Sequence, residues 1–490
     1  MKLNRIPESV SSVHLIAVCG TAMAALAALL REQGIQVTGS DQNVYPPMST
    51  FLESRGIEIL AGFKAENLDS RPDLVVVGNA VTRANPEAEA LARSGLHFCS
   101  MPQALNRFAA RGRRTLMVAG THGKTTTSSI TAWLMEAGGL NPGFMIGGIL
   151  KNYDSNYQLG TGPHFVVEGD EYDTAFFDKE PKFFHYVPDS LIVTGIEFDH
   201  ADIFTDLEHI RSKFRRLIRE LPGNSLLVAR AEDPQLAPLT KETSCIVETY
   251  GTGPDACWRL SGIEIRPPLT AFEVHRNGRF FGRFETSMIG EHNLLNATAA
   301  IAVAHRAGLS PEAIARGLRD FQGVRRRQEV RGRAGGVTVM DDFAHHPTAV
   351  RETLKAVKPF CGNGRLIAVF EPRTNTSMRK IFQDEYPGSF SGADLVCIRQ
   401  PSALGKVPEA ERFSAEKLVD DINRAGISAG YFRDTEGILS FLEAEAKSGD
   451  FVLVMSNGGF DNIHERLLAT LRKRPSSAGA RPPGAQAVSG

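Results

Sequence analysis

A lysine and a threonine follow an apolar run in a pattern typical of phosphate binding. Residues 115–119 read as a strand that enters a glycine-bearing turn and then a helix. The N–H groups of such a turn and the helix dipole attract an anion. Lys124 would neutralise the β- and γ-phosphates of ATP, and Thr125 would offer its hydroxyl to Mg²⁺. A chance Gly/Thr turn is disfavoured, because strand and helix lie where the motif needs them. The predicted ATP-binding residues are Gly120, Thr121, His122, Gly123, Lys124, Thr125 and Thr126.

Acidic residues follow two further strand candidates. Glu168 comes after the strand 165–167, and the string 197–202 carries His200 between carboxylates after the strand 190–193. Hard cations prefer oxygen ligands, so carboxylates at a strand end beside a phosphate loop are candidate Mg²⁺ ligands. Taken alone, an acidic turn is more often a solvated loop, and a single histidine there is more often structural. Beside the phosphate loop we interpret Glu168 as a metal ligand and His200 as a candidate ligand.

Three further groups of polar residues suit a nucleotide. Asn293 and Asn296 lie three apart on one helix face, where they would either cap the helix or read a purine edge. The run 325–327 is all arginine, which suits phosphate oxygens that gain charge during transfer, or forms only a solvated linker. Asp342 follows a strand candidate and would accept hydrogen bonds from ribose hydroxyls. The next two histidines are either acid–base groups or turn residues.

The spacing of strands and helices predicts an α/β protein of several domains. The chain has 490 residues, enough for roughly three domains. In the first segment a strand at 14–18, a helix at 23–33 and strands at 36–38 and 74–77 form βαβ units, although the dinucleotide fingerprint GxGxxG is absent. Strands at 225–228, 337–340, 366–370, 395–398 and 451–455 extend the pattern. The Pro-, Ala-, Gly- and Ser-rich segment 475–490 is predicted to be a disordered tail.

Composition narrows the class of protein. Lys+Arg number 55 against 56 Asp+Glu, a balance that points to neither a nucleic-acid nor a membrane-surface partner. The six cysteines are far apart and contain no CxxC pair, which fits a reducing cytoplasm rather than a disulfide framework or a zinc site. The apolar stretch 14–30 is interrupted by Gly20 and Thr21, and we interpret it as a buried strand and helix.

In this order, the motifs resemble the Mur ligases, the ATP-dependent amide-forming enzymes of bacterial cell-wall synthesis, over about residues 13–470. The resemblance implies a Rossmann-like N-terminal domain for a UDP-sugar (1–112), a central P-loop ATPase domain (113–328) and a C-terminal Rossmann-like α/β domain for the incoming amine (329–474). It also implies that Lys124, Glu168, His200 and Arg327 are catalytic, and that Thr125, Glu168 and His200 are metal-linked. The remaining ATP contacts it implies are Asn293 and Asn296 at the adenine, Arg326 or Arg327 at the phosphates and Asp342 at the ribose.

Within the family, the strings 39–50, 197–204 and 371–378 are similar to the branch that attaches L-alanyl-γ-D-glutamyl-meso-diaminopimelate to UDP-N-acetylmuramate in peptidoglycan recycling. The branch that adds L-alanine is the alternative, because the phosphate loop and the turn 341–347 resemble it. A nucleotide-sensing P-loop protein without catalysis is a more distant alternative. Arg373 is expected to meet an acidic group of the peptide, unless it forms only a surface ion pair. The full set of expected substrate-binding residues is Gly20, Thr21, Ala22, Met23, Ser40, Asp41, Asn79, Thr82, Arg373 and Ser377.

Overall fold

The structure is a computed structural model that describes residues 4–402 and 404–473, so the predicted tail 475–490 lies outside the described residues. The chain divides between Arg327 and Gln328 into two compact units. The first unit contains two large sheets and the second contains one. The predicted α/β class is therefore confirmed, with parallel strands in each sheet. The predicted domain boundaries at 112/113 and 328/329 stay a prediction.

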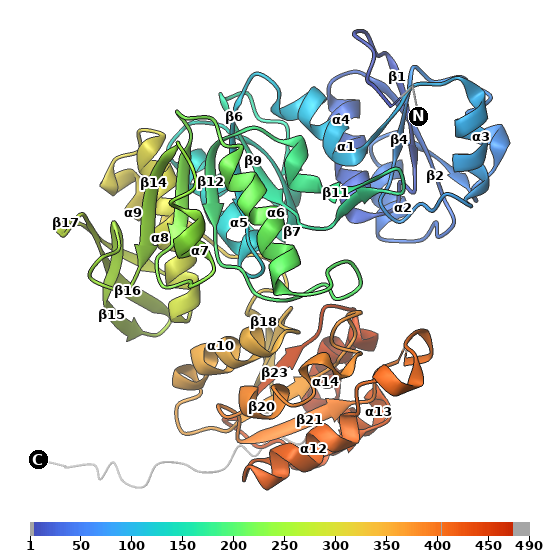
Figure 1. Cartoon of the computed structure of the whole chain (residues 1–490). Helices are drawn as coiled ribbons and strands as arrows, with labels where there is room; N and C mark the ends of the chain where they lie inside the picture. Colours follow the sequence, from blue (N-terminus) through green and yellow to red (C-terminus); the bar gives the residue numbers. More distant parts are fainter. Residues whose placement is uncertain (1–3, 403, 474–490) are drawn as a thin grey trace, which may run out of the picture. The chain divides into compact units, whose positions relative to one another are not determined.

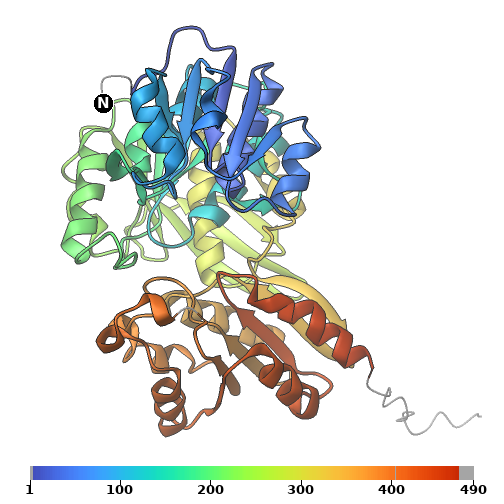
Figure 2. The ribbon, with the colours of Figure 1, turned by 90° about the vertical axis from the view of Figure 1, so that its right-hand side faces the viewer.

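The first sheet has five parallel strands in the order β3-β2-β1-β4-β5. They are β1 (Ser12–Ile16), β2 (Gln36–Asp41), β3 (Glu58–Ala61), β4 (Leu74–Val77) and β5 (Phe98–Ser100). The helices are α1 (Thr21–Glu32), α2 (Met48–Glu53), α3 (Pro86–Ser94) and α4 (Met101–Leu105). Figures 1 and 2 show α3 on one face and α1 with α4 on the other, so both faces of the sheet are covered. The buried residues of β1 and β4 are accordingly apolar, with His14 as the exception. The strand order reverses between β1 and β4, which opens a crevice at their carboxyl ends.

The second sheet has ten strands in the order β17-β16-β15-β14-β13-β12-β6-β9-β7-β8. Its strands are β6 (Arg114–Ala119), β7 (Gly143–Leu150), β8 (Ser155–Gln158), β9 (His164–Gly169), β12 (Pro188–Val193), β13 (Leu226–Arg230), β14 (Ile246–Gly251), β15 (Trp258–Arg266), β16 (Leu269–Arg276) and β17 (Arg279–Thr286). A separate hairpin pairs β10 (Asp173–Ala175) with β11 (Asp178–Pro181). The sequence predicted four of these strands and missed the antiparallel β15–β17, whose alternating polar residues resemble loops.

Helices cover both faces of this second sheet (Figure 1). Side chains of α5 (Lys124–Ala137), α8 (Glu291–Arg306) and α9 (Pro311–Asp320) share one hydrophobic core with the sheet. Side chains of α6 (Leu207–Arg219) and α7 (Leu236–Leu239) belong to the core on the other face. The sheet is therefore a buried layer, and the groups at the carboxyl ends of its parallel strands are held on rigid elements.

The third sheet has the order β18-β19-β23-β20-β21-β22, in which only β18 runs antiparallel to its neighbour. Its strands are β18 (Glu329–Ala334), β19 (Val337–Asp342), β20 (Leu366–Phe370), β21 (Leu395–Arg399), β22 (Ser428–Phe432) and β23 (Phe451–Met455). The helices are α10 (Pro347–Val357), α11 (Tyr386–Ser389), α12 (Ala415–Arg424), α13 (Thr435–Glu445) and α14 (Ile463–Arg472). The arginine run 325–327 is thus followed directly by an edge strand, β18.

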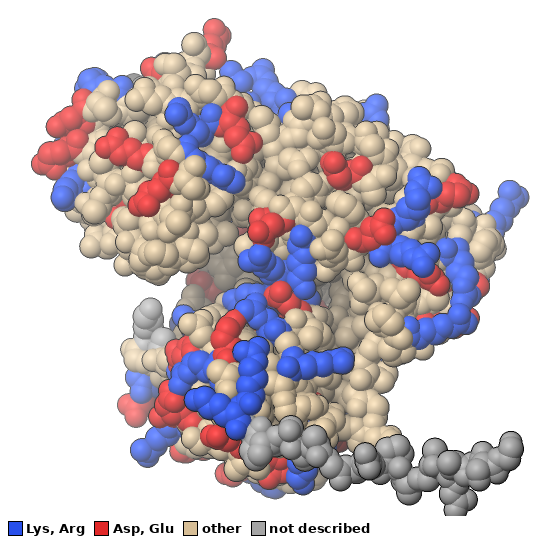
Figure 3. Space-filling view, turned by 180° about the vertical axis from the view of Figure 1, so that it is seen from behind, with Lys and Arg blue, Asp and Glu red and all other residues tan. Residues whose placement is uncertain are grey.

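Two properties of the structure agree with the composition. Lys, Arg, Asp and Glu side chains are interspersed over the face seen in Figure 3. All six cysteines are free. Across residues 4–402 and 404–473, none of the helices combines the length and the apolar character needed to cross a bilayer.

Candidate active site

The phosphate loop lies between β6 and α5, as the sequence predicted. Two of its glycines have backbone conformations that disfavour a side chain, with φ 123° at Gly120 and φ 82° at Gly123. Neighbours also leave no room for one. A Cβ on Gly120 would lie 2.3 Å from Thr194 Oγ1, and a Cβ on Gly123 would lie 2.8 Å from Asn296 Oδ1. Both glycines are therefore required by the fold of the loop.

The segment after β12, residues 194–197, forms hydrogen bonds with the phosphate loop. Thr194 Oγ1 donates to the carbonyl of His122 at 2.5 Å, and the Thr121 N–H donates to the carbonyl of Gly195 at 2.9 Å. Thr121 Oγ1 also donates to the carbonyl of Glu197 at 3.1 Å. These contacts preorganise the turn, because β6 and β12 are adjacent parallel strands. Thr126, the third residue of α5, is half-buried.

Lys124 is folded back toward the loop and paired with an acid. Its Nζ donates to the Gly120 carbonyl at 2.6 Å and to Glu171 Oε1 at 2.8 Å. Burial lowers the pKa of Lys124, but Glu171, together with Asp170 and Glu168, outweighs burial, and the net pKa is raised. The lysine is therefore held as a cation at the helix N-terminus, where phosphate oxygens would bind.

Glu168 lies inside β9, which continues to Gly169 instead of ending at residue 167. Its Oε1 accepts from the Gly147 N–H at 2.7 Å, and its carboxylate also hydrogen-bonds Thr125. Burial raises the pKa of Glu168, against the opposing effects of the Gly147 N–H and Lys124. A desolvated carboxylate beside a threonine hydroxyl is a pair of oxygen donors that fits a hard cation such as Mg²⁺.

The side chain of His200 contacts Glu171. Its Nε2 lies 3.1 Å from Glu171 Oε1, and its ring centroid is 4.2 Å from that of Tyr172. Burial lowers the pKa of His200, but the hydrogen bond and charge of Glu171 outweigh burial and raise it overall. Glu171, only 3 % exposed, thus joins His200 to Lys124. Glu171 lies three residues after Glu168 but was not predicted as a site residue, because sequence spacing does not show which carboxylate faces the lysine.

The asparagine pair lies on the first turn of α8, beside the loop. The helix N-cap is Gly290 and no side chain caps it, so the capping alternative is wrong. Asn293 Nδ2 instead donates backward to the Ile289 carbonyl at 2.9 Å, and Asn296 Nδ2 lies 3.4 Å from Asn293 Oδ1. Both asparagines are buried, and the amide of Asn296 lies next to Gly123 of the loop.

The three arginines differ in their surroundings. Arg325 pairs with Asp154 at 2.5 Å and is exposed. Arg327 Nη2 lies 3.5 Å from Thr125 Oγ1, beside the phosphate loop. Arg326 is half-buried and has a left-handed backbone, φ 62°. The contact of Arg327 with Thr125 favours Arg327 as the phosphate contact.

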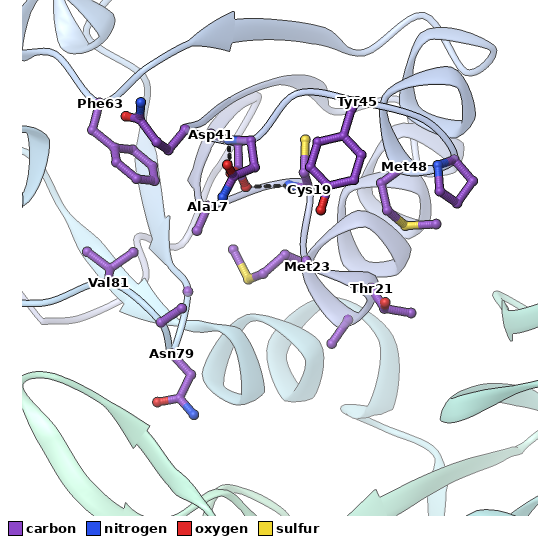
Figure 4. A pocket seen from close by; sticks show the side chains of 17 residues that line it. Ala17, Cys19, Thr21, Met23, Asp41, Tyr45, Met48, Phe63, Asn79 and Val81 are labelled. Atoms are coloured by element: carbon purple, nitrogen blue, oxygen red, sulfur yellow. Dashed lines mark hydrogen bonds between the residues drawn. The ribbon is translucent and has the colours of Figure 1, made fainter. Parts of the chain in front are cut away.

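A cavity of about 790 Å³ lies at the carboxyl ends of β1, β2 and β4 in the first domain. Asp41 shapes it by accepting from the Cys19 N–H and the Asn43 N–H, both at 2.9 Å, and Figure 4 shows Asp41 and Met23 facing the same space. The expected substrate residues that line it are Gly20, Thr21, Ala22, Met23, Asp41 and Asn79.

Two expected substrate residues lie outside the lining of this cavity. Ser40 is fully buried, and its Oγ donates to Glu87 Oε2 at 2.7 Å inside the domain. Glu87 also accepts from His14, so Ser40 belongs to a buried polar network. Thr82 is exposed and follows the lining residue Val81.

In the C-terminal domain the expected residues lie at carboxyl ends of strands. Asp342 is buried and accepts from the N–H groups of Gln328 and Ala344, both at 2.8 Å, so it stabilises its own turn. Arg373, after β20, is 46 % exposed, with Nη1 4.0 Å from Glu371 Oε2. Ser377 is buried, and its Oγ accepts from the Thr374 N–H at 2.9 Å. Of the three side chains, Arg373 is the one open to a ligand.

A cluster that the sequence did not reveal supports Arg373. The buried carboxylate of Glu371 accepts from Arg399 Nη1 at 2.5 Å and from Ser456 Oγ at 2.6 Å. Arg399 also donates to Asp461 at 2.7 Å. Glu371, Arg399 and Ser456 lie at the ends of β20, β21 and β23, so the strand order brings these three residues together.

A P-loop α/β domain with a Rossmann-like domain before it and another after it defines a class of ATP-using enzymes. Three family models match the chain. The model described as "Mur ligase family, catalytic domain" matches residues 12–113, and the model described as "Mur ligase middle domain" matches residues 118–304. The model described as "Mur ligase, glutamate ligase domain" matches residues 326–458. The chain belongs to the Mur ligase family. It is an ATP-dependent ligase that forms amide bonds and acts on small molecules.

Individual relatives extend over nearly the whole chain. The UDP-N-acetylmuramate–L-alanyl-γ-D-glutamyl-meso-2,6-diaminoheptandioate ligase of Escherichia coli K12 is 43 % identical over 95 % of this chain and 99 % of its own length. The UDP-N-acetylmuramate–L-alanine ligase of Rhizobium etli is 35 % identical over 93 % of this chain and 95 % of its own length. Among solved structures, a murein peptide ligase from Psychrobacter arcticus matches with a TM-score of 0.69 and 34 % identity, covering 95 % of this chain and 99 % of that one.

Proposed function

We propose that this ligase joins L-alanyl-γ-D-glutamyl-meso-diaminopimelate to UDP-N-acetylmuramate, as a step of peptidoglycan recycling in the cytoplasm. The observation that carries the proposal is the 43 % identity, over 95 % of the chain, to the Escherichia coli ligase named for these substrates. The L-alanine ligase is the second candidate, and it is supported by 35 % identity over a similar length.

The reaction needs two steps, because a carboxylate does not acylate an amine at neutral pH. The lactyl carboxylate of UDP-N-acetylmuramate attacks the γ-phosphorus of ATP, which breaks the bond to the β-phosphate oxygen and releases ADP. The peptide amine then attacks the acyl carbon of the acyl phosphate, forms a tetrahedral intermediate and, after losing a proton, expels phosphate. The protein must therefore stabilise charge on the transferring phosphoryl group.

The phosphate loop supplies that charge in our proposal. Lys124 leaves the Gly120 carbonyl for the phosphates, while Glu171 keeps it protonated. Arg327, 3.5 Å from Thr125, adds a second cation. Thr125 and Glu168 would hold Mg²⁺, which would neutralise negative charge on the phosphate oxygens. We place His200 at this centre through Glu171, whose carboxylate it shares with Lys124.

The other contacts to the nucleotide and the substrates are assigned from the resemblance to the family, and the UDP site also from a cavity. Asn293 and Asn296 would border the adenine and Asp342 the ribose. Arg326 is the alternative to Arg327 at the phosphates. The UDP group would occupy the 790 Å³ cavity along Asp41 and its neighbours. The tripeptide's acidic groups would meet Arg373, because arginine pairs with carboxylates in a two-pronged geometry.

One assay distinguishes the candidates. ADP release is measured with UDP-N-acetylmuramate and either the tripeptide or L-alanine as acceptor. Turnover with the tripeptide and little with L-alanine is expected; turnover with L-alanine alone would overturn the substrate assignment. Lys124→Ala should lower kcat by about 10²-fold or more, as for loss of one preorganised charge-stabilising group. Lys241→Ala, an exposed lysine in the same unit, is the control and should turn over normally.

A further inference from the structure

A second cavity, of about 570 Å³, lies where the first domain passes into the central domain, away from the loop and the UDP cavity. Four arginines line it, Arg5, Arg107, Arg111 and Arg113, and none of the aspartates or glutamates within 4–402 and 404–473 does. His185 completes the basic lining, and its Nε2 pairs with Asp178 at 2.9 Å. Four like charges around one cavity repel one another unless an anion balances them.

The backbone at this cavity is unusual. After α4 the chain forms one turn of π-helix, Asn106–Ala110, closed by a hydrogen bond from the Arg111 N–H to the Asn106 carbonyl at 2.8 Å. Such turns are rare and occur frequently at functional sites. This turn places Asn106, Arg107 and Arg111 along the same cavity. The arginines of the linker therefore converge instead of spreading over a solvated surface.

Two of these arginines, Arg107 and Arg113, are positioned by uncharged acceptors. Arg107 Nη2 donates to the Glu8 carbonyl at 3.1 Å. Arg113 donates to the carbonyls of Leu159 and Gly160 at 2.5 Å and 3.1 Å. These acceptors are backbone oxygens, which fix a guanidinium in place but carry no formal charge. Arg5 and Arg111 are exposed at the mouth.

We infer that this cavity binds a small organic anion that carries phosphate groups. Guanidinium groups match phosphate oxygens in geometry and charge. A volume of about 570 Å³ lies in the range of small-molecule sites and exceeds the needs of one phosphate ion. Its walls come from the first domain through Arg107 and from the central domain through Arg113 and His185, so a bound anion would tie the two together. The inference does not depend on which acceptor the ligase uses.

Inorganic pyrophosphate is the probe, titrated by calorimetry into the full chain. The protein is first saturated with Mg·ADP and UDP-N-acetylmuramate, so that the phosphate loop and the UDP cavity are filled. The test variant is Arg5→Glu/Arg111→Glu, in which both side chains are exposed. The matched control is Arg266→Glu/Arg279→Glu, the same change of charge on the exposed β15–β17 region.

We expect the wild type and the control to bind pyrophosphate. The test variant should bind it about tenfold more weakly or worse, because it loses charge-assisted hydrogen bonds. Affinity should also fall steeply as salt rises. No binding by the saturated wild type, or equal binding by both double variants, would overturn the inference. If the double variant does not fold, Arg111→Gln is compared with Arg279→Gln by the same criterion. Loss of ligase turnover in Lys124→Ala leaves this outcome unaffected, so the two proposals fail separately.

Discussion

Replacing Glu171 by glutamine tests whether this acid, rather than its neighbours, supports the phosphate-loop lysine. The carboxylate is 3 % exposed and contacts Lys124 Nζ at 2.8 Å and His200 Nε2 at 3.1 Å. Glutamine has nearly the same shape and removes only the charge. A matched control is Glu180→Gln, because Glu180 also contacts two cations, Lys213 at 3.1 Å and Arg216 at 3.2 Å, but is 43 % exposed.

The expected loss of stability follows from burial. Removing one partner of a buried ion pair costs about 3–5 kcal/mol, because the other charge is left uncompensated. The glutamine oxygen still accepts a hydrogen bond from Lys124, which retains about 1.5–3 kcal/mol. The difference predicts a destabilisation of roughly 2 kcal/mol for Glu171→Gln. The exposed pair of Glu180 is screened by water, so its loss should cost less than about 1 kcal/mol.

Tryptophan fluorescence during urea unfolding measures this effect in the right domain. The chain has two tryptophans, Trp133 on α5 and Trp258 on β15, and both lie in the central domain. At constant slope, the shift of the midpoint gives the change in the free energy of unfolding. A shift for Glu171→Gln that is no larger than that for Glu180→Gln would refute the assignment of Glu171 as the buried partner of Lys124.

Two more predictions concern the loop and the third sheet. Gly123→Ala should weaken ADP binding, measured by calorimetry, about tenfold or more, because the added Cβ would lie 2.8 Å from Asn296 Oδ1. Gly139→Ala is the control, because Gly139 also has a positive φ, 76°, but a Cβ added there would meet no neighbouring group within 4 Å. It should cost about 1–2 kcal/mol of stability and leave the affinity for ADP unchanged. Burial raises the pKa of Asp450, but Arg365 and backbone N–H groups outweigh burial and lower it overall. Its stabilisation is therefore present above the unfolded pKa of about 3.9 and is lost as pH falls through the lower folded pKa. The melting temperatures of the wild type and of Asp450→Asn are followed by circular dichroism from about pH 7 to pH 3, and the difference between them should shrink as the pH falls. A difference that stays constant would contradict the lowered pKa of Asp450.

Elements defined by local pattern were predictable. The strand–glycine–helix order around Lys124 places β6 and α5 as expected, because apolar runs and turn glycines act within a few residues. Antiparallel strands β15–β17 were missed, since their half-exposed residues alternate without a long apolar run. Ser40 looked like a strand-end ligand, yet the longer β2 and the buried Glu87 draw it into the interior.

The sequence by itself determined the phosphate loop, the α/β class and the family, because these depend on residue order over short spans. Tertiary structure decided which side chains meet. Glu171 rather than Glu168 contacts Lys124 because β9 lies beside β6, and the turn after β9 directs the later carboxylate to the lysine. The cluster beside Arg373 forms in the same way, because Arg399 and Ser456 reach Glu371 from strands that are far apart in the chain. Such contacts depend on strand order and on the direction of each side chain, which one-dimensional spacing does not contain.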